Sequence, residues 1–166
     1  MRAARPLALT AAFLVIAACN GSTTTSTTAV DTNVYTADPA TSQYASSLNV
    51  TIGSMLKTPS GLYYKDLVVG TGATAGAGFT ARVQYTGWLP NGVAFDSTAG
   101  RTPDYFEFLI NAGKVIKGWD EGVQGMKVGG KRQLVIPPGL GYGDSGSGSI
   151  PGNAILVFEI SLVQLR

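Results

Sequence analysis

Five stretches of the chain are rich in β-branched and aromatic residues, a pattern that predicts β-strands. They run from Leu62 to Val69, Phe79 to Gly87, Tyr105 to Ile110, Lys131 to Ile136 and Ile155 to Leu165. In the last stretch, large apolar residues occupy every second position: Leu156, Phe158, Ile160 and Leu162. Because alternate residues of a strand share a face, we expect these four side chains to face the core.

A single segment, Val115 to Met126, has the pattern of a helix. Val115, Trp119 and Val123 recur at the i, i+4 spacing and would lie on one helix face. Glycines at positions 118, 122 and 125 lower the intrinsic helix propensity of the segment. A sheet packed closely against the helix would explain these glycines, so the sequence predicts an α+β domain.

The first residues predict a targeting signal. Arg2 and Arg5 form a basic start, and the apolar run from Leu7 to Ala18 is too short to span a membrane stably. The run ends in Ile16-Ala17-Ala18-Cys19, which looks like a bacterial lipobox. We therefore predict a lipoprotein signal peptide at residues 1–18 and lipidation of Cys19. An ordinary secretory signal followed by a chance cysteine is the alternative.

The segment after Cys19 is mostly Ser, Thr, Ala and Gly, with isolated Val34, Tyr35 and Tyr44. Such a composition cannot bury enough apolar area to offset the entropy of ordering. We therefore expect a lipid-anchored disordered tether at residues 19–50 and one folded domain at residues 51–166. The tether has no helical periodicity that would form a dimerisation arm, so we expect a monomer.

Charge does not favour nucleic acid as a partner. The chain has 12 basic and 10 acidic residues, and loss of the signal peptide would remove Arg2 and Arg5 and leave equal numbers. A neutral chain with scattered charges offers no positive field to a phosphate backbone. Lys127, Lys131 and Arg132 come nearest to a basic cluster, and we interpret them as a solvated strand edge.

The chain has no histidine, and Cys19 is its single cysteine. Ser-His and Cys-His catalysis and histidine-bound metals are therefore excluded. We expect neither a metal nor any other cofactor.

Large apolar residues beside glycine or a single polar group recur through the second half of the chain. They occur in Tyr85-Thr86-Gly87, Phe95-Asp96-Ser97, Val115-Ile116-Lys117-Gly118-Trp119, Tyr142-Gly143 and Leu156-Val157-Phe158. These segments are too far apart to form one linear motif. They predict a concave apolar pocket, assembled from several strands and loops, with a few polar groups that orient a ligand.

Taken in order, these segments resemble the FKBP-type peptidyl-prolyl cis-trans isomerases, a family that also binds macrolide immunosuppressants. The resemblance runs from about Gly61 to Leu165. It implies a twisted antiparallel β-sheet wrapped around one short α-helix. It also implies catalysis of X-Pro bond rotation without a covalent intermediate.

The resemblance implies a role for each candidate residue. The expected catalytic residues are Asp96, Trp119, Tyr142 and Phe158. The expected substrate-binding residues are Tyr85, Phe95, Arg101, Phe106, Val115, Ile116 and Ile150. Trp119 would lie under the proline ring, and the backbone N–H of Ile116 would bond a substrate carbonyl. Asp96 would hold the Tyr85 hydroxyl and pair with Arg101.

The residues alone leave other interpretations open. Trp119 and the remaining aromatic residues could be ordinary core, and Asp96 could be a turn residue that bonds its own backbone. Arg101 could be solvated, and Tyr142 could be an exposed loop tyrosine.

We predict a lipid-anchored isomerase of the bacterial cell envelope, with its domain in the periplasm and exported proteins as substrates. Expected partners are proline-containing polypeptides, macrolide immunosuppressants and, through the lipid, a membrane. One rival is a chaperone or adaptor that binds proline segments with little turnover. The other is a structural envelope lipoprotein with a vestigial pocket.

Overall fold

The structure is a computed structural model that describes residues 38–166. The predicted signal peptide, Cys19 and the first part of the predicted tether lie outside the described residues. Among the helices of residues 38–166, none has the length and apolar character needed to cross a membrane.

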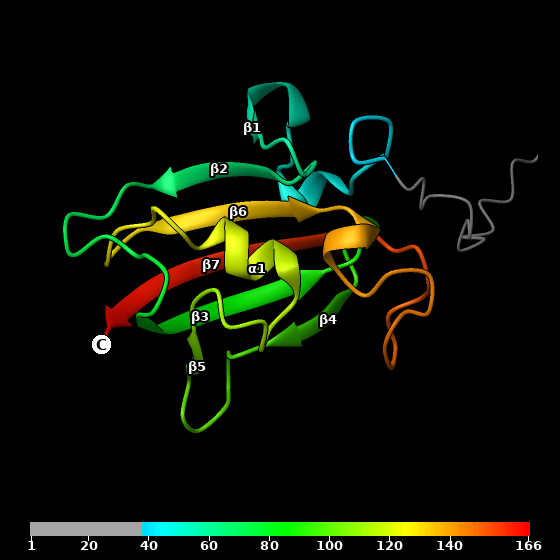
Figure 1. Cartoon of the computed structure of the whole chain (residues 1–166). Helices are drawn as coiled ribbons and strands as arrows, with labels where there is room; N and C mark the ends of the chain where they lie inside the picture. The colour runs from blue at the N-terminus through cyan, green and yellow to red at the C-terminus, as the bar shows by residue number, and fades with distance from the viewer. Residues whose placement is uncertain (1–37) are drawn as a thin grey trace, which may run out of the picture. The chain divides into compact units, whose positions relative to one another are not determined.

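One antiparallel sheet forms the frame of this part of the chain (Figure 1). Its strands are β1 (Leu56–Lys57), β2 (Tyr63–Val68), β3 (Thr80–Trp88), β4 (Ala94–Ser97), β5 (Phe106–Leu109), β6 (Lys131–Ile136) and β7 (Leu156–Leu165). Their order in the sheet is β1-β2-β6-β7-β3-β4, and β5 also pairs with β3. The helices are α1 (Lys117–Gly122) and the 3-10 turns η1 (Ser46–Leu48), η2 (Ile52–Ser54) and η3 (Pro138–Leu140).

The five predicted strands are confirmed as β2, β3, β5, β6 and β7, with ends that differ by at most one residue. Leu156, Phe158, Ile160 and Leu162 all belong to the main buried core, as the alternation of β7 predicted. The strands β1 and β4 were not predicted. β1 has only two residues, and β4 has the sequence Ala-Phe-Asp-Ser, in which a single large apolar residue shows no alternation.

The predicted helix is real but shorter than Val115 to Met126. Ile116 has an extended backbone, with φ −59° and ψ 146°, so α1 begins at Lys117. At the other end, the chain leaves the helix and reaches Gly125, whose φ of +76° suits glycine. The helix is thus confined to six residues.

Two glycines let α1 approach the sheet closely. A Cβ atom on Gly118 would lie 2.6 Å from Ile136 Cγ2, and one on Gly122 would lie 2.7 Å from Leu134 Cδ1. Both distances are too short for real side chains. The expectation that a close sheet explains the glycine-rich helix is therefore confirmed.

Two short strands share the sheet edge beyond β3. β5 pairs with β3 over Thr80–Val83, and β4 pairs with it over Thr86–Trp88. Thr98 pins the start of the intervening segment, since its Oγ1 accepts the Tyr85 N–H at 3.1 Å and its N–H donates to the Tyr85 carbonyl at 3.0 Å. β4 and β5 therefore pair with different parts of β3, on either side of Tyr85.

A second, smaller core lies on the sheet face away from α1. Its buried residues are Leu48, Tyr63, Val135, Ile155 and Val157. Packed against them are Tyr44, Ala45, Val50, Ile52, Met55 and Trp88. We call residues 38–55 the strap (cyan in Figure 1). The prediction of a disordered tether up to residue 50 is therefore wrong for residues 38–50, because their few apolar side chains meet an apolar area of the sheet.

Arg132 is buried, with 6% of its surface exposed. Its Nε and Nη2 donate to the two carboxylate oxygens of Asp66 at 2.6 and 3.1 Å. Its Nη1 donates to the carbonyls of Gly122 and Gln124, both at 3.0 Å. The interpretation of Arg132 as part of a solvated strand edge is wrong, because the side chain satisfies carbonyls at the end of α1.

Candidate active site

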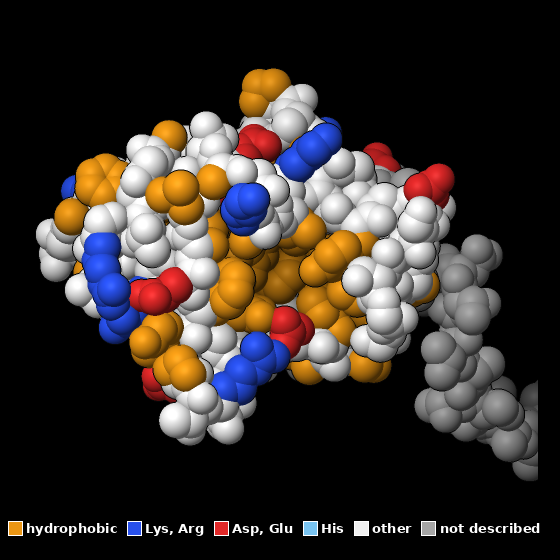
Figure 2. Space-filling view, turned by 60° about the horizontal axis from the view of Figure 1, so that its bottom comes forward, with side chains coloured by type: hydrophobic (Ala, Val, Ile, Leu, Met, Phe, Trp, Pro, Cys, Tyr) orange, Lys and Arg blue, Asp and Glu red, His pale blue; other side chains and the backbone are white. Residues whose placement is uncertain are grey.

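A cavity of about 530 Å³ opens between α1, the β4–β5 edge and the segment after η3. Figure 2 shows it as a hollow lined by hydrophobic side chains, with charged side chains at its rim. Its lining residues are Tyr85, Phe95, Asp96, Arg101, Phe106, Gly113, Lys114, Val115, Ile116, Trp119, Tyr142 and Phe158. The structure thus brings together ten of the eleven candidate site residues, from elements far apart in the sequence.

Trp119 connects the cavity to the core. Its side chain is 4% exposed and also lines the cavity. Trp119 is therefore both a core tryptophan and part of the pocket wall. Its ring meets those of Tyr85 and Phe158 edge to face, at centroid distances of 4.8 and 5.2 Å. The indole N–H has no hydrogen-bond partner among the described residues.

Gly87 allows two walls of the cavity to meet. Phe95 on β4 and Phe158 on β7 pack edge to face at 5.4 Å. A Cβ atom on Gly87 would lie 2.7 Å from Phe95 Cζ and 2.6 Å from Phe158 Cε1. A larger residue at position 87 would therefore separate the two rings.

Asp96 is the polar centre of the site. Its Oδ2 accepts the Tyr85 hydroxyl at 2.5 Å, and its Oδ1 forms an ion pair with Arg101. Oδ1 also accepts the N–H of Ser97 at 2.9 Å. The interpretation of Asp96 as a turn residue is wrong, because Asp96 lies in β4, although its carboxylate does accept a neighbouring backbone N–H while it organises the site. The pairing with Tyr85 and Arg101 that the resemblance implied is present.

The two tyrosine hydroxyls of the site stay neutral at ordinary pH. Burial, together with the hydrogen bond to Asp96, raises the pKa of Tyr85 to about 12. Burial also raises the pKa of Tyr142, with a further contribution from the negative charge of Asp96. Tyr85 therefore keeps the proton that it donates to Asp96, and the Tyr142 hydroxyl is available as a hydrogen-bond donor rather than as a base.

The backbone N–H of Ile116 is free to bind a ligand. Ile116 precedes α1 and lines the cavity, and its N–H donates no hydrogen bond to another residue of the described chain. Helix N-termini leave such donors without an intrahelical partner. A carbonyl that entered the cavity could therefore accept from this group.

Three residues of the site were not predicted from the sequence: Gly113 and Lys114, which line the cavity, and Asp120 behind them. Asp120 lies buried on α1, where its Oδ1 accepts the N–H of Asn111 at 2.8 Å and its Oδ2 that of Gly113 at 2.9 Å. The carboxylate thereby holds the loop that leads to Ile116. The sequence did contain a signal for Asp120, since an acidic residue directly after Trp119, on a helix expected to be buried, needs hydrogen-bond donors around it.

Ile150 is the one candidate among the eleven that does not line the cavity. It is 8% exposed and packs in the main core. Its N–H and carbonyl pair with Ser147 at 2.8 and 2.9 Å, which closes a small turn in the segment after Tyr142. The expectation that Ile150 contacts substrate is therefore not supported, because the turn directs its side chain into the core.

The arrangement offers aromatic walls, a few hydrogen-bond donors and one paired carboxylate. No serine, threonine or cysteine is among the residues that line it. In the described part of the chain, no group of three or more His, Cys, Asp or Glu residues could hold a metal ion. Such a cavity can exclude water from a bound chain segment and orient its carbonyl groups.

Comparisons with known proteins identify the fold and the family. A family model described as FKBP-type peptidyl-prolyl cis-trans isomerase matches residues 72–163. A Neisseria meningitidis protein named FK506-binding protein is 48% identical over 106 residues, which are 63% of this chain and 96% of that one. FK506-binding protein 4 of Dictyostelium discoideum is 53% identical over 111 residues. That match covers 66% of this chain but only 30% of the longer relative.

Solved structures agree with these matches. The crystal structure of AtFKBP13 has a TM-score of 0.63 and 39% identity, and the match covers 68% of this chain and 99% of that one. FkpA from Escherichia coli has a TM-score of 0.62 and 36% identity, with 68% and 51% coverage. The predicted fold class, an antiparallel sheet with one short helix, is confirmed. This chain belongs to the FKBP-type peptidyl-prolyl cis-trans isomerase family.

Proposed function

We propose that this chain is a peptidyl-prolyl cis-trans isomerase that rotates X-Pro bonds in polypeptides. The observation that carries the proposal is the cavity itself, whose aromatic walls surround a single paired carboxylate and a free backbone N–H. Its volume of about 530 Å³ suits a short peptide segment. Family membership supports the same activity.

Rotation of a peptide bond needs no nucleophile. The barrier of about 18–20 kcal/mol arises from amide resonance, which is lost as the bond twists. The twisted amide is less dipolar than the planar one, so water stabilises the planar state more. Transfer from water to a dry aromatic cavity therefore costs the planar amide more than the twisted one, which lowers the barrier to rotation. Trp119, Phe95 and Phe158 provide that surface, with Trp119 under the proline ring.

The polar groups would hold the substrate rather than react with it. The N–H of Ile116 donates to one substrate carbonyl, and the hydroxyl of Tyr142 donates to another. Asp96 fixes Tyr85 and Arg101 and sets the field around the twisting carbonyl. Fixed dipoles of this kind need no reorganisation during the reaction.

Isomerase kinetics test the proposal. A tetrapeptide with one X-Pro bond is transferred to a solvent that changes its cis content, and relaxation is followed with increasing protein. We expect the relaxation rate to rise in proportion to protein concentration. Excess proline peptide or a macrolide immunosuppressant should suppress the increase by occupying the cavity.

The rival function is a proline-binding chaperone or adaptor. It predicts that the same peptide binds, measured by the change in tryptophan fluorescence as Trp119 in the cavity is covered, but that relaxation is not accelerated. Binding without acceleration would replace the isomerase proposal with this rival. A chain that neither binds nor accelerates would fit the structural lipoprotein with a vestigial pocket.

The raised tyrosine pKa predicts a specific dependence on pH. Between about pH 6 and 8 we expect constant activity, because the chain has no histidine and both tyrosines keep their protons. An unfolded tyrosine titrates near pH 10, whereas folded Tyr85 has a pKa of about 12. Above about pH 10 the unfolded state binds fewer protons, so the free energy of unfolding should fall as pH rises.

Urea unfolding at pH 8 and at about pH 10.5 measures this effect, with Tyr85→Phe as the control that lacks the group. We expect the decrease to be smaller in Tyr85→Phe. An equal decrease in both proteins would show that Tyr85 is not responsible. A bell-shaped activity profile between about pH 6 and 8 would instead indicate acid–base chemistry.

The location of the protein is a separate part of the proposal. Lipidation of Cys19 would hold the domain at a bacterial membrane, where exported proteins are its substrates. The lipobox-like sequence before Cys19 supports this proposal. Mass spectrometry of native protein and of Cys19→Ser decides it, since only native protein should carry acyl chains and stay with the membrane fraction.

A further inference from the structure

The sheet face away from α1 changes from apolar to polar along the strands. At one end, Val157 on β7 lies opposite Trp88 on β3 and Val135 on β6. Tyr63 on β2 continues this row beyond Val135. The strap covers this apolar row, and Leu48 is the strap residue most deeply buried on it, with 6% exposure.

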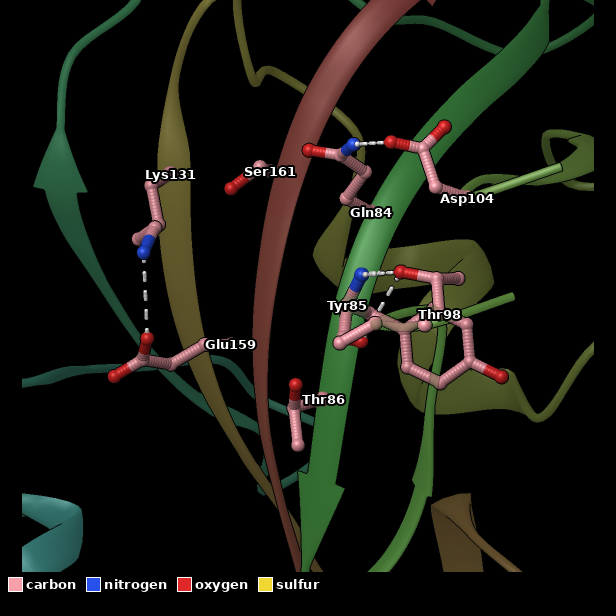
Figure 3. Close-up of a pocket in the computed structure, with 10 residues that line it drawn as sticks. Gln84, Tyr85, Thr86, Thr98, Asp104, Lys131, Glu159 and Ser161 are labelled. Carbon is pink, nitrogen blue, oxygen red and sulfur yellow. Dashed lines mark hydrogen bonds and ion pairs between the residues drawn. The ribbon is translucent and has the colours of Figure 1, made fainter. Parts of the chain in front are cut away.

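The next two rows are polar, and all of their side chains except that of Gln133 are at least partly exposed. They consist of Thr86, Glu159 and Gln133, and then of Gln84, Ser161 and Lys131. Figure 3 shows these side chains, apart from that of Gln133, around a shallow pocket, where Lys131 pairs with Glu159 at 3.6 Å and Gln84 donates to Asp104 at 2.8 Å. The face is therefore apolar where the strap lies and polar where it does not. Such a match indicates that the strap is a permanent part of the domain.

Gln133 marks the border between the two areas. It is 2% exposed, and its Nε2 donates to the carbonyl of Leu48 at 2.8 Å. A buried amide without a partner is costly, so this hydrogen bond fixes where the strap crosses the sheet.

The strap also contacts the turn between β3 and β4. The N–H of Ala45 donates to the carbonyl of Pro90 at 2.8 Å. A Cβ atom on Gly92 would lie 3.1 Å from the Cβ of Ala45 and 3.3 Å from Ser47 Oγ. The turn and the strap are thus in direct contact through backbone atoms.

That turn leads directly into β4, the edge strand that carries Phe95 and Asp96. β4 has four residues and pairs with β3 alone. A strand this short forms few hydrogen bonds with the sheet. The contacts at its two ends therefore decide the position of its side chains. The strap holds one end through Pro90, and Thr98 pins the other to Tyr85.

We propose that the strap is a positioning element of the cavity, which holds Trp88 and the β3–β4 turn and thereby fixes Phe95 and Asp96. The proposal rests on the isomerase function proposed above. It assigns Ala45 and Leu48 a positioning role for catalysis although neither lines the cavity.

The test compares two proline substitutions at neighbouring positions of the full chain. Ala45→Pro removes the N–H that reaches Pro90, and its ring would push the turn away. The backbone of Ala45, with φ −57°, already suits proline. Ser46→Pro is the control, because Ser46 is the first residue of η1, where proline is favoured, and its N–H donates to no described residue.

Activity is measured well below the unfolding temperature, with folding checked by near-ultraviolet circular dichroism. We expect Ala45→Pro to lower kcat/KM by about fivefold, since small displacements of catalytic groups are costly, and Ser46→Pro to change it less than twofold. The loss should appear mainly in kcat, because the deep aromatic walls remain. A folded Ala45→Pro protein with the activity of the control would overturn the proposal.

Amide hydrogen exchange provides a readout that does not depend on activity. In Ala45→Pro, the N–H of Gly92, which donates to Leu89, should exchange about tenfold faster as the turn loosens. The N–H of Ala75, which donates to Met126 in another loop, should not change. Equal exchange rates of the Gly92 N–H in both variants would refute the claim that the strap holds the β3–β4 turn in place.

Two further outcomes are distinguishable. If Ala45→Pro does not fold, Leu48→Ala gives the same comparison, because it loosens the strap from the sheet without adding a ring. If the native chain does not isomerise peptides, the proposed function fails. The exchange measurement then still decides whether the strap holds the turn.

Discussion

Phe158→Ala should abolish most of the isomerase activity. Phe158 is 3% exposed and meets the rings of Phe95, Tyr85 and Trp119. Its loss would open the dry wall of the cavity to water and remove the surface that favours the twisted amide. We expect kcat/KM to fall by about 100-fold, equal to about 2.7 kcal/mol of transition-state stabilisation.

The substitution also affects folding, so it needs a matched control. Removal of a buried phenylalanine costs about 3–5 kcal/mol of stability. Ile160→Ala removes a fully buried side chain from the same face of the same strand, but Ile160 does not line the cavity. At a temperature where circular dichroism shows both variants folded, Ile160→Ala should keep kcat/KM within about threefold. An equal loss in both would assign the effect to stability rather than to the cavity.

Asp96→Asn should lower kcat/KM by about tenfold, equal to about 1.4 kcal/mol. The change conserves shape but removes the negative charge that holds Arg101 and accepts the Tyr85 hydroxyl. The charged Arg101 would lose its partner, and the field around the substrate carbonyl would change. Steady-state kinetics on the same X-Pro peptide measure the effect.

Asp66→Asn is a close control for this variant. Asp66 also pairs with an arginine, Arg132, and its side chain is 37% exposed, compared with 38% for Asp96. It lies outside the cavity, so Asp66→Asn should reduce stability and leave kcat/KM unchanged. Complete inactivity of folded Asp96→Asn would mean that the carboxylate acts as an acid or base. That result would contradict a mechanism based on orientation and water exclusion.

The hydrophobic pattern was sufficient to predict five of the seven strands among the described residues. The alternation of β7 placed Phe158 and Ile160 correctly, because each strand is long enough to show a period of two. The glycines of α1 predicted close packing against the sheet, which the contacts of Gly118 and Gly122 confirm. Ten of the eleven candidate residues reach the cavity, since the family resemblance supplied the long-range order that spacing lacks.

Short or irregular elements were not predictable in this way. β4 is an edge strand of four residues, and its register comes from pairing with β3 rather than from its own sequence. Ile150 was expected in the cavity, but the turn with Ser147 directs it into the core. Local patterns carry no information about such turns.

The sequence by itself determined the α+β class and the core strands, because these follow from local periodicity, and its resemblance to the family indicated the aromatic and acidic residues of the site. Only the tertiary structure decided the roles of Arg132, Asp120 and the strap. Arg132 and the strap depend on partners far along the chain, Asp66 for Arg132 and Pro90 for Ala45, and Asp120 depends on the path of the loop before α1. The strap has the composition of a disordered segment, and it is ordered because an apolar row of the sheet lies beneath it.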